Sequence, residues 1–223
     1  MKSKLIVALD VENFQRAEAL VEQLGDAVEL YKVGSQLFTR VGPRIVEFLS
    51  ARGRRCFLDL KFHDIPSTVA KAVESAAALG VAMTTVHTMG GADMLRAAVA
   101  VPNRPALFGV TVLTSVGGEV AAEVVQRAKL AADCGLDGVV ASGHEVWRIR
   151  EALGRKLLVV TPGIRPAWAE AGDQKRTMTP AEAVAAGADF LVVGRPIVAA
   201  PDPVAAVERV IGEMLSACAA PNL

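Results

Sequence analysis

Three charged residues lie close together near the end of one apolar segment: Asp59, Lys61 and Asp64. The segment Cys56–Leu60 is predicted to be a short strand, and side chains alternate along a strand, so Asp59 and Lys61 should project from the same face. A carboxylate and an ammonium are costly to desolvate there unless they pair or take part in chemistry. Such a pair can donate a proton or stabilise developing charge. A structural ion pair that caps the strand is the alternative.

Other polar residues stand at the ends of further apolar segments. Lys32 is unusual because it lies within the apolar run Leu-Tyr-Lys-Val-Gly, from which charges are normally excluded. The residues at or just beyond predicted strand ends are Asp10, Lys32, Asp59, Lys61, Asp64, His87, Thr111, Thr114, Pro162, Gly163, Arg165, Gly194 and Arg195. This number of ionisable groups exceeds what strand capping requires, and it favours one catalytic site if the strand ends meet.

The elements that must position these residues alternate strictly along the chain. The predicted strands are Leu5–Leu9, Glu29–Val33, Cys56–Leu60, Met83–His87, Ala106–Val112, Gly138–Ala141, Leu157–Thr161 and Phe190–Val193. The predicted helices are Asn13–Leu24, Pro43–Ala51, Ser67–Leu79, Ala92–Ala100, Glu119–Cys134, Glu145–Leu153, Pro180–Ala186 and Pro203–Ala217. Apolar strands alternating with amphipathic helices predict an α/β fold, a (β/α)₈ TIM barrel.

Local signals mark several of the predicted helix ends. Asn13, Ser67 and the pair Thr179-Pro180 are expected to begin helices, as capping or first-turn residues. Glycines that precede the next strand should adopt the left-handed conformation that ends a helix; these are Gly25, Gly53, Gly80, Gly135 and Gly187.

An open doubly wound sheet is the alternative architecture. It usually carries a Gly-rich turn after the first strand, whereas here Asp10-Val11-Glu12 follows. The barrel is therefore favoured, and in a barrel the carboxyl ends of all strands meet at one face, where the chemistry takes place.

Two segments near the end of the chain indicate a phosphate site. Gly194 and Arg195 follow the eighth predicted strand, where barrels commonly bind phosphate through backbone N–H groups and a guanidinium. The connection from Arg165 to Thr179 is long and polar, which is typical of a disordered segment or of a lid. Because it begins beside the predicted phosphate site, a lid is favoured, with Gln174 reaching the ligand.

Composition bounds the remaining possibilities. The 223 residues carry 24 basic and 24 acidic side chains, so no electrostatic signal points to nucleic acid or to an anionic membrane. The cysteines Cys56, Cys134 and Cys218 are widely spaced and fit free thiols in a reducing compartment. The N-terminal apolar run is too short for a signal peptide or a membrane span. We expect a cytoplasmic protein with one domain over residues 1–223.

Some residues carry no catalytic expectation. His87 is predicted to be a structural histidine, since no second His or Cys stands at metal-ligand spacing, and His63 is out of phase with Lys61. Met83, Met89 and Met94 are predicted to fill the core.

Taken together, these motifs resemble the bacterial type of the orotidine 5′-phosphate decarboxylase family over nearly the whole chain. The matching segments are Val-Ala-Leu-Asp (7–10), Tyr-Lys-Val-Gly (31–34), Phe-Leu-Asp-Leu-Lys-Phe-His-Asp-Ile-Pro (57–66), Val-Thr-Val-Leu-Thr-Ser (110–115), Thr-Pro-Gly-Ile-Arg (161–165), Gly-Asp-Gln (172–174) and Val-Gly-Arg-Pro-Ile (193–197). The Asp-x-Lys-x-x-Asp motif together with Lys32 is highly specific. Pro166 is a small departure, because an aliphatic residue is common after that arginine.

The resemblance implies a role for each matching residue. Lys61 would donate the proton, with Asp59 against the substrate carboxylate and Lys32 in the charge network. Asp10 and Lys32 would contact the ribose and Thr114 the pyrimidine. Pro162, Arg165, Gln174, Gly194 and Arg195 would bind the substrate, mostly at its phosphate end. Asp64, Ile65 and Thr68 would reach across the interface of a homodimer into the partner's site. The reaction would convert orotidine 5′-monophosphate to uridine 5′-monophosphate, the last step of de novo pyrimidine nucleotide synthesis, with no metal and no cofactor.

Two rival functions remain. The magnesium-dependent hexulose-phosphate synthases and keto-gulonate-phosphate decarboxylases of the same superfamily share the Asp-x-Lys-x-x-Asp motif. At the position of Lys32 they look as if they carry Glu, which helps to hold the metal. A lysine at that position would repel Mg²⁺. A catalytically inactive barrel that binds a phosphate ligand is the second rival, and no feature of the sequence supports it.

Overall fold

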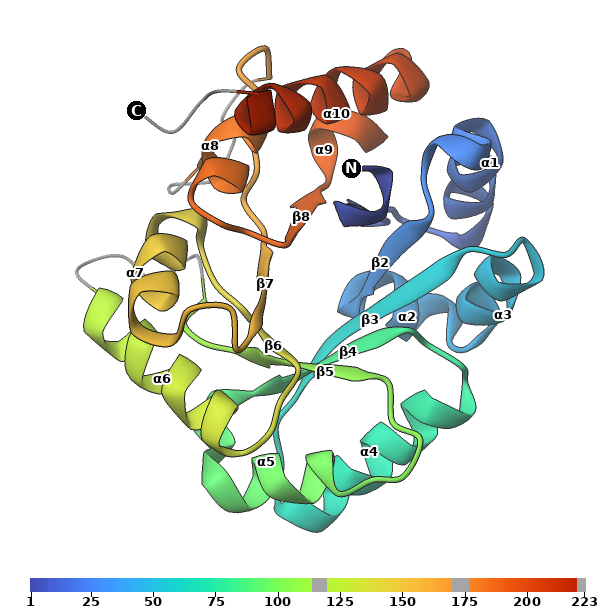
Figure 1. The fold of residues 1–223 in the computed structure, drawn as a ribbon. Helices are drawn as coiled ribbons and strands as arrows, with labels where there is room; N and C mark the ends of the chain where they lie inside the picture. Colours follow the sequence, from blue (N-terminus) through green and yellow to red (C-terminus); the bar gives the residue numbers. More distant parts are fainter. Residues whose placement is uncertain (114–119, 170–176, 220–223) are drawn as a thin grey trace.

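Eight parallel strands close into a barrel in the order of the sequence, each paired with the next and β8 with β1. This is seen in a computed structural model that describes residues 1–113, 120–169 and 177–219 (Figure 1). The strands are β1 (Leu5–Ala8), β2 (Leu30–Gly34), β3 (Arg55–Phe62), β4 (Met83–His87), β5 (Ala106–Val110), β6 (Gly138–Val140), β7 (Leu158–Thr161) and β8 (Phe190–Val193). The predicted (β/α)₈ barrel is confirmed.

The helices form a ring outside the strands (Figure 1). They are α1 (Phe14–Leu24), α2 (Ser35–Val41), α3 (Arg44–Ala51), α4 (Pro66–Ala78), α5 (Gly91–Val99), α6 (Ala121–Asp133), α7 (Gly143–Leu153), α8 (Pro180–Ala185), α9 (Arg195–Val198) and α10 (Pro203–Ala219). Short 3₁₀ turns are η1 (Lys2–Lys4), η2 (Gly25–Ala27) and η3 (Thr88–Gly90). The sequence did not predict α2 and α9, which directly follow β2 and β8 and are too short to show a helical period.

The sheet has apolar side chains on both faces, as the both-face-buried strands predicted. One cluster joins residues from different strands around Phe57 and Phe108, whose ring centroids are 6.1 Å apart. Its buried members are Ile6, Ala8, Leu30, Phe57, Met83, Phe108, Val160 and Val192. The larger cluster lies between strands and helices. Gly138 of β6 makes room for the first cluster, because a Cβ there would lie 2.4 Å from the Phe108 ring.

Most local signals are confirmed. The Asn13 side chain accepts a hydrogen bond from the Arg16 N–H at the start of α1, and Thr179 forms a capping box with Glu182. The five glycines predicted to end helices all have positive φ, from 44° at Gly25 to 101° at Gly187. The prediction that a helix begins at Ser67 was wrong, because α4 begins one residue earlier, at Pro66.

Two further predictions were wrong. Strand β3 continues to Phe62 instead of ending at Leu60, so Lys61 lies within it. Met89 is not core filler: it lies in η3, directly after β4, and is 62% exposed. Met83 and Met94 are buried as expected.

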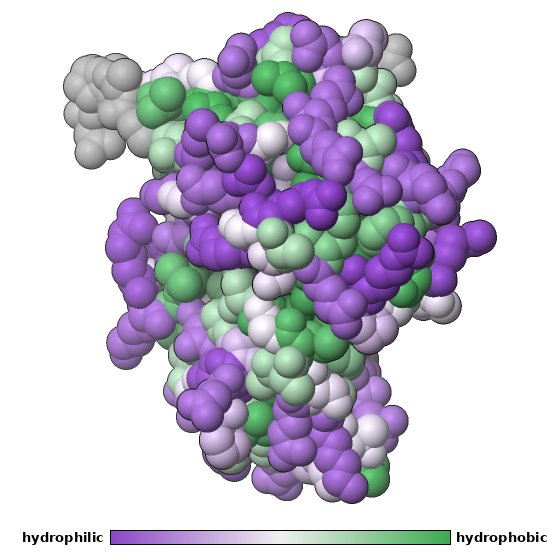
Figure 2. All heavy atoms as spheres, turned by 90° about the vertical axis from the view of Figure 1, so that its right-hand side faces the viewer, coloured by the Kyte–Doolittle hydropathy of each residue, from purple (hydrophilic) through white to green (hydrophobic). Residues whose placement is uncertain are grey.

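The face over α1 and α3 is mostly hydrophilic, with small hydrophobic areas between charged side chains (Figure 2). Arg52 covers the Phe48 ring and pairs with Glu22 at 2.7 Å, which joins α3 to α1. Within the ranges described, none of the helices combines the length and apolar character needed to cross a membrane.

Candidate active site

A cavity of about 400 Å³ opens where the strands end. Its charged and polar wall is formed by Asp10, Lys32, Asp59, Lys61, Arg165 and Arg195. Its apolar lining is formed by Ala8, Phe57, Val110, Val112, Leu113, Val140, Val160, Pro162 and Val192. The cavity therefore offers an apolar surface for a flat group beside a strongly charged rim.

Carboxylates and ammonium groups alternate along one side of this cavity. The Lys61 Nζ donates to both oxygens of Asp59 at 2.9 Å. The Lys32 Nζ lies 2.8 Å from Asp10 Oδ1 and 3.9 Å from Asp59 Oδ2. Asp59 is only 13% exposed and lies between the two ammonium groups, so its charge is compensated by direct pairing.

The pairing of β2 with β3 positions this row of charges. Lys32 is opposite Phe57 and Gly34 is opposite Asp59 in the register of the two strands. Gly34 is needed for packing, because a Cβ at that position would lie 3.0 Å from Lys32 Nζ and 3.3 Å from Asp10 Oδ1. The glycine therefore leaves room for the Lys32–Asp10 pair.

The Lys61 side chain is brought to Asp59 by a backbone conformation that regular strand alternation does not predict. Its φ is 54°, in the left-handed region that residues other than glycine rarely adopt. The register between β3 and β4 also shifts between Leu58 and Phe62. The expectation that the two side chains share a face is met, but by an irregular backbone that bends the strand.

The guanidinium groups of Arg165 and Arg195, which follow β7 and β8, also line the cavity. Burial lowers the pKa of Arg165, and the nearby charge of Arg195 lowers it further. Pro162, Gly163 and Gly194 line the cavity as well, and Gly163 has a φ of 75° that favours glycine. Like charges brought together beside a cavity favour an anion between them, and the planar guanidinium group matches the geometry of phosphate and of carboxylate.

The two ends of the predicted lid are joined at its base. The Arg165 N–H donates to the Met178 carbonyl at 2.9 Å, and Ile164 bridges to Met178. Trp168 packs against the core under Arg209, whose guanidinium lies 4.1 Å from the ring centroid. Gln174 lies outside the described residues, as does Thr114, so both remain predictions.

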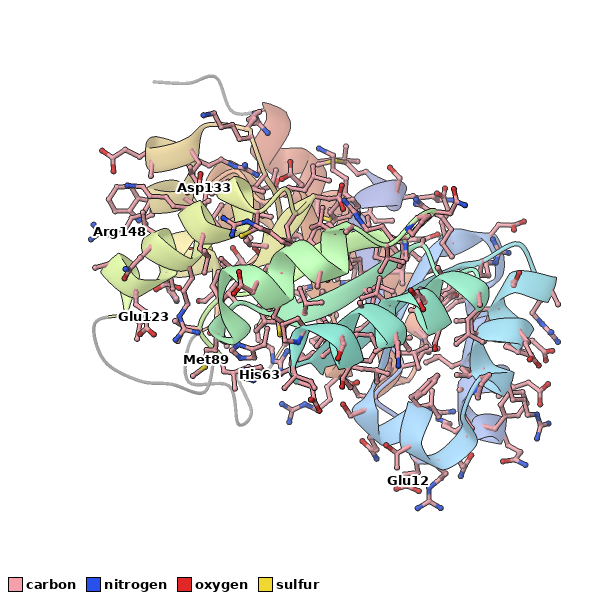
Figure 3. All side chains as sticks on the ribbon, turned by 90° about the horizontal axis from the view of Figure 1, so that it is seen from below. Glu12, His63, Met89, Glu123, Asp133 and Arg148 are labelled. Atoms are coloured by element: carbon pink, nitrogen blue, oxygen red, sulfur yellow. The ribbon has the colours of Figure 1, made fainter. Side chains whose placement is uncertain are left out.

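Asp64, Ile65 and Thr68 are exposed and do not line the described cavity. Asp64 Oδ1 instead accepts a hydrogen bond from the Ile65 N–H at 2.6 Å. Figure 3 places Glu12, His63 and Met89 along one edge of the molecule, which is where β1, β3 and β4 end. Asp64 and Ile65 directly follow His63 in the sequence.

The two histidines of the rim stack on each other, with ring centroids 5.4 Å apart. The His87 Nδ1 accepts a hydrogen bond from the Met89 N–H at 3.3 Å, which fits the structural role predicted for His87. Burial lowers the pKa of His87, and the charges of His63, Arg127 and Lys61 lower it further. A neutral His87 is therefore favoured, as its acceptor role requires.

Sequence reasoning missed one polar residue of the site. Thr85 is fully buried in β4, and its hydroxyl contacts both Asp59 and the Lys61 backbone. It lies two residues after Met83, which belongs to the first cluster, so the period of two could have placed it on the same face.

The site offers little to a metal ion. Among the residues that the structure describes, His, Cys, Asp and Glu side chains do not gather in threes as metal ligands. The most buried carboxylate of the site, Asp59, already pairs with Lys61 and faces Lys32. Two ammonium groups at this distance oppose a divalent cation.

Comparison with known proteins gives one consistent result. Residues 3–210 match the family described as "Orotidine 5'-phosphate decarboxylase / HUMPS family". The chain is 51% identical to an orotidine 5′-phosphate decarboxylase of Syntrophotalea carbinolica, covering 97% of this chain and 96% of the relative. It is 48% identical to the enzyme of the same name from Nitrosococcus oceani, covering 96% and 98%. The crystal structure of orotidine 5′-phosphate decarboxylase from Lactobacillus acidophilus superimposes with a TM-score of 0.82 at 38% identity, covering 94% of this chain and 98% of that one.

Proposed function

Because the chain belongs to the orotidine 5′-phosphate decarboxylase / HUMPS family, we propose that it decarboxylates orotidine 5′-monophosphate to uridine 5′-monophosphate. One observation carries the choice within the family: the alternating row Asp10, Lys32, Asp59 and Lys61 at the cavity. This row suits a substrate that carries a carboxylate and must receive a proton in its place.

In the substrate orientation that we propose, the phosphate binds between Arg165 and Arg195, and the ribose hydroxyls contact Asp10 and Lys32. All four residues line the cavity, which supports this orientation. The pyrimidine rests on the apolar lining, in contact with Pro162 and Thr114. This orientation places C6 of the pyrimidine beside Asp59 and Lys61.

The chemistry follows from the charges. The bond between C6 and the carboxylate breaks, CO₂ leaves, and the electron pair stays on C6 as a carbanion. The Lys61 ammonium stabilises this charge and then transfers its proton to C6. Asp59 holds Lys61 in place and faces the departing carboxylate, so a like-charge contact is relieved as CO₂ leaves. Binding of the remote phosphate helps to organise these groups.

The reaction needs no cofactor in this proposal, because Lys61 supplies both the positive charge and the proton. The magnesium-dependent members of the superfamily are the alternative. Lys32 argues against them, since its ammonium occupies the space between Asp10 and Asp59 where a cation would have to bind.

The active form is a cytoplasmic homodimer in which Asp64, Ile65 and Thr68 complete the partner's site. Ile65 is 64% exposed and Met89 62% exposed, both at the ends of neighbouring strands, which is unusual for large apolar side chains. The Asp64 carboxylate accepts a hydrogen bond from the Ile65 N–H and does not line the described cavity. A second copy that covers this edge would bury the apolar side chains and bring its own Asp64 to Lys61.

The proposal is tested by turnover of the purified chain. We expect orotidine 5′-monophosphate to yield uridine 5′-monophosphate and CO₂ at equal rates before and after treatment with EDTA. Activity that is lost in EDTA and restored by Mg²⁺, or turnover of a hexulose phosphate in place of the nucleotide, would favour the alternative.

A further inference from the structure

A side chain of the neighbouring strand contacts the unusual backbone of Lys61. The Lys61 N–H donates to the Thr85 Oγ1 at 2.8 Å, across from β3 to β4. The residue lies where the register of these strands shifts, and its φ of 54° is costly for a residue with a long side chain. A specific interaction is therefore needed to hold this conformation, and the Thr85 hydroxyl supplies it.

The same hydroxyl also fixes Asp59. Thr85 Oγ1 lies 3.0 Å from Asp59 Oδ1, which at the same time accepts from the Lys61 Nζ at 2.9 Å. A hydroxyl has one proton, and an ionised carboxylate only accepts, so the proton of Thr85 must point to Asp59. The Thr85 oxygen can then accept a hydrogen bond from the Lys61 backbone N–H. One atom thus joins the backbone of Lys61 to the carboxylate that binds its ammonium.

The neighbouring threonine of β4 shows the ordinary role of such a residue. Thr84 is equally buried, but its hydroxyl donates to the Leu58 carbonyl at 2.9 Å and reaches no side chain of the site. It faces the opposite side of the strand. The two residues share type, strand and burial, and they differ in the face of the strand that they occupy and in what their hydroxyls contact.

We propose that Thr85 is a positioning residue of the decarboxylase site, which holds Lys61 and Asp59 in the geometry required for proton transfer to the substrate. This inference rests on the proposed function. Without the hydroxyl, the Lys61 N–H loses its partner and Asp59 Oδ1 loses a donor. The backbone of Lys61 can then relax to the extended conformation, which moves its ammonium away from the reacting carbon.

Thr85→Val tests the role, because valine keeps the branched shape and removes the hydroxyl. A displacement of about 1 Å at a reacting group can cost about a hundredfold in rate, so we expect kcat to fall by about that factor or more. The affinity for the product uridine 5′-monophosphate, measured by calorimetry, should stay within about threefold, since Arg165, Arg195, Asp10 and Lys32 are unchanged. Thr85→Ser keeps the hydroxyl and should stay within about tenfold of the wild-type kcat.

Thr84→Val is the matched control, since it removes a buried hydroxyl from the same strand. It should lose thermal stability as Thr85→Val does, while kcat stays within about threefold of wild type. If the kcat of Thr85→Val lies within tenfold of the Thr84→Val value, Thr85 is an ordinary buried threonine and the inference is wrong. Should Thr85→Val fail to fold, the comparison of Thr85→Ala with Thr85→Ser decides, and equal kcat values would overturn the inference.

Crystal structures of the variants separate this inference from the proposed function. Lys61 should keep its positive φ in Thr85→Ser and lose it in Thr85→Val, whatever substrate the enzyme takes. A retained positive φ in Thr85→Val would overturn the positioning role. An inactive wild type with the expected change at Lys61 would instead overturn the proposed function alone.

Discussion

At the scale of single residues, the site depends on charges held by their direct neighbours. The Asp59 carboxylate accepts a hydrogen bond from the Lys61 ammonium at 2.9 Å. The Lys32 ammonium is held mainly by Asp10, at 2.8 Å. Each ammonium therefore has its own carboxylate, and Asp59 lies within reach of both. This arrangement is consistent with the distinct roles that we propose, with Lys61 as proton donor and Lys32 as part of the binding network.

Replacement of Lys61 tests the proton donor. Lys61→Ala removes the proton and the positive charge beside C6, so turnover should fall by well over a hundredfold while the circular dichroism spectrum is unchanged. Lys129→Ala, which removes an exposed lysine of α6, is the control and should keep full activity. A Lys61→Ala enzyme that retains more than about a hundredth of the wild-type rate would rule out this role, because the loss would be below roughly 3 kcal/mol.

Arg195 is expected to act on the substrate phosphate. Arg195→Ala should lower kcat/KM by more than about tenfold for the nucleotide and have almost no effect on a truncated substrate without phosphate. Kinetics on both substrates measure the difference, with the exposed Arg148→Ala as the control. Equal losses on the two substrates would mean that Arg195 acts through folding.

At the scale of elements, the ends of adjacent strands determine how the side chains meet. β2 contributes Lys32 together with the small Gly34, and β3 contributes Asp59 opposite that glycine. β4 contributes Thr85, which holds the irregular end of β3. The active site is thus built from consecutive strands, and a disturbance of one strand end should be felt by its neighbour.

Gly34→Ala tests this packing between strand ends. The new Cβ would lie 3.0 Å from Lys32 Nζ, so the Lys32–Asp10 pair must shift. We expect activity to fall by about tenfold to a hundredfold with the fold retained. Gly212→Ala in α10 is the control, because a Cβ there meets no atom within 4 Å and alanine should stabilise the helix by about 1 kcal/mol. Unchanged activity in Gly34→Ala would show that the position of this pair is not critical.

At the scale of the whole molecule, the candidate site lies at the end of the barrel where the strands end. The edge formed by the ends of β3 and β4 carries the exposed Ile65 and Met89 beside Asp64. The symmetric dimer that we propose would cover these apolar side chains and bring Asp64 of one chain to Lys61 of the other through one interface.

A mixing experiment tests this dimer. Inactive Lys61→Ala and inactive Asp64→Ala chains, refolded together, should form heterodimers with one doubly altered site and one wild-type site. About a quarter of the wild-type activity should return, because random pairing puts half of the chains in heterodimers. Activity should also depend on protein concentration near the dissociation constant. Heterodimers that form without any recovery of activity would place Asp64 in the site of its own chain.

The sequence alone determined the barrel, because strand and helix periods and the glycines that end helices are local properties. It also determined which charges stand at strand ends, since a lysine such as Lys32 within an apolar run is visible without a structure. The contacts between the side chains of the site could not be predicted from the sequence. The positive φ of Lys61, the space that Gly34 leaves for Lys32 and the double role of Thr85 depend on which strands become neighbours and in what register. Register is set by the closure of the whole barrel, through packing between residues far apart in the chain, and only the tertiary structure decides it.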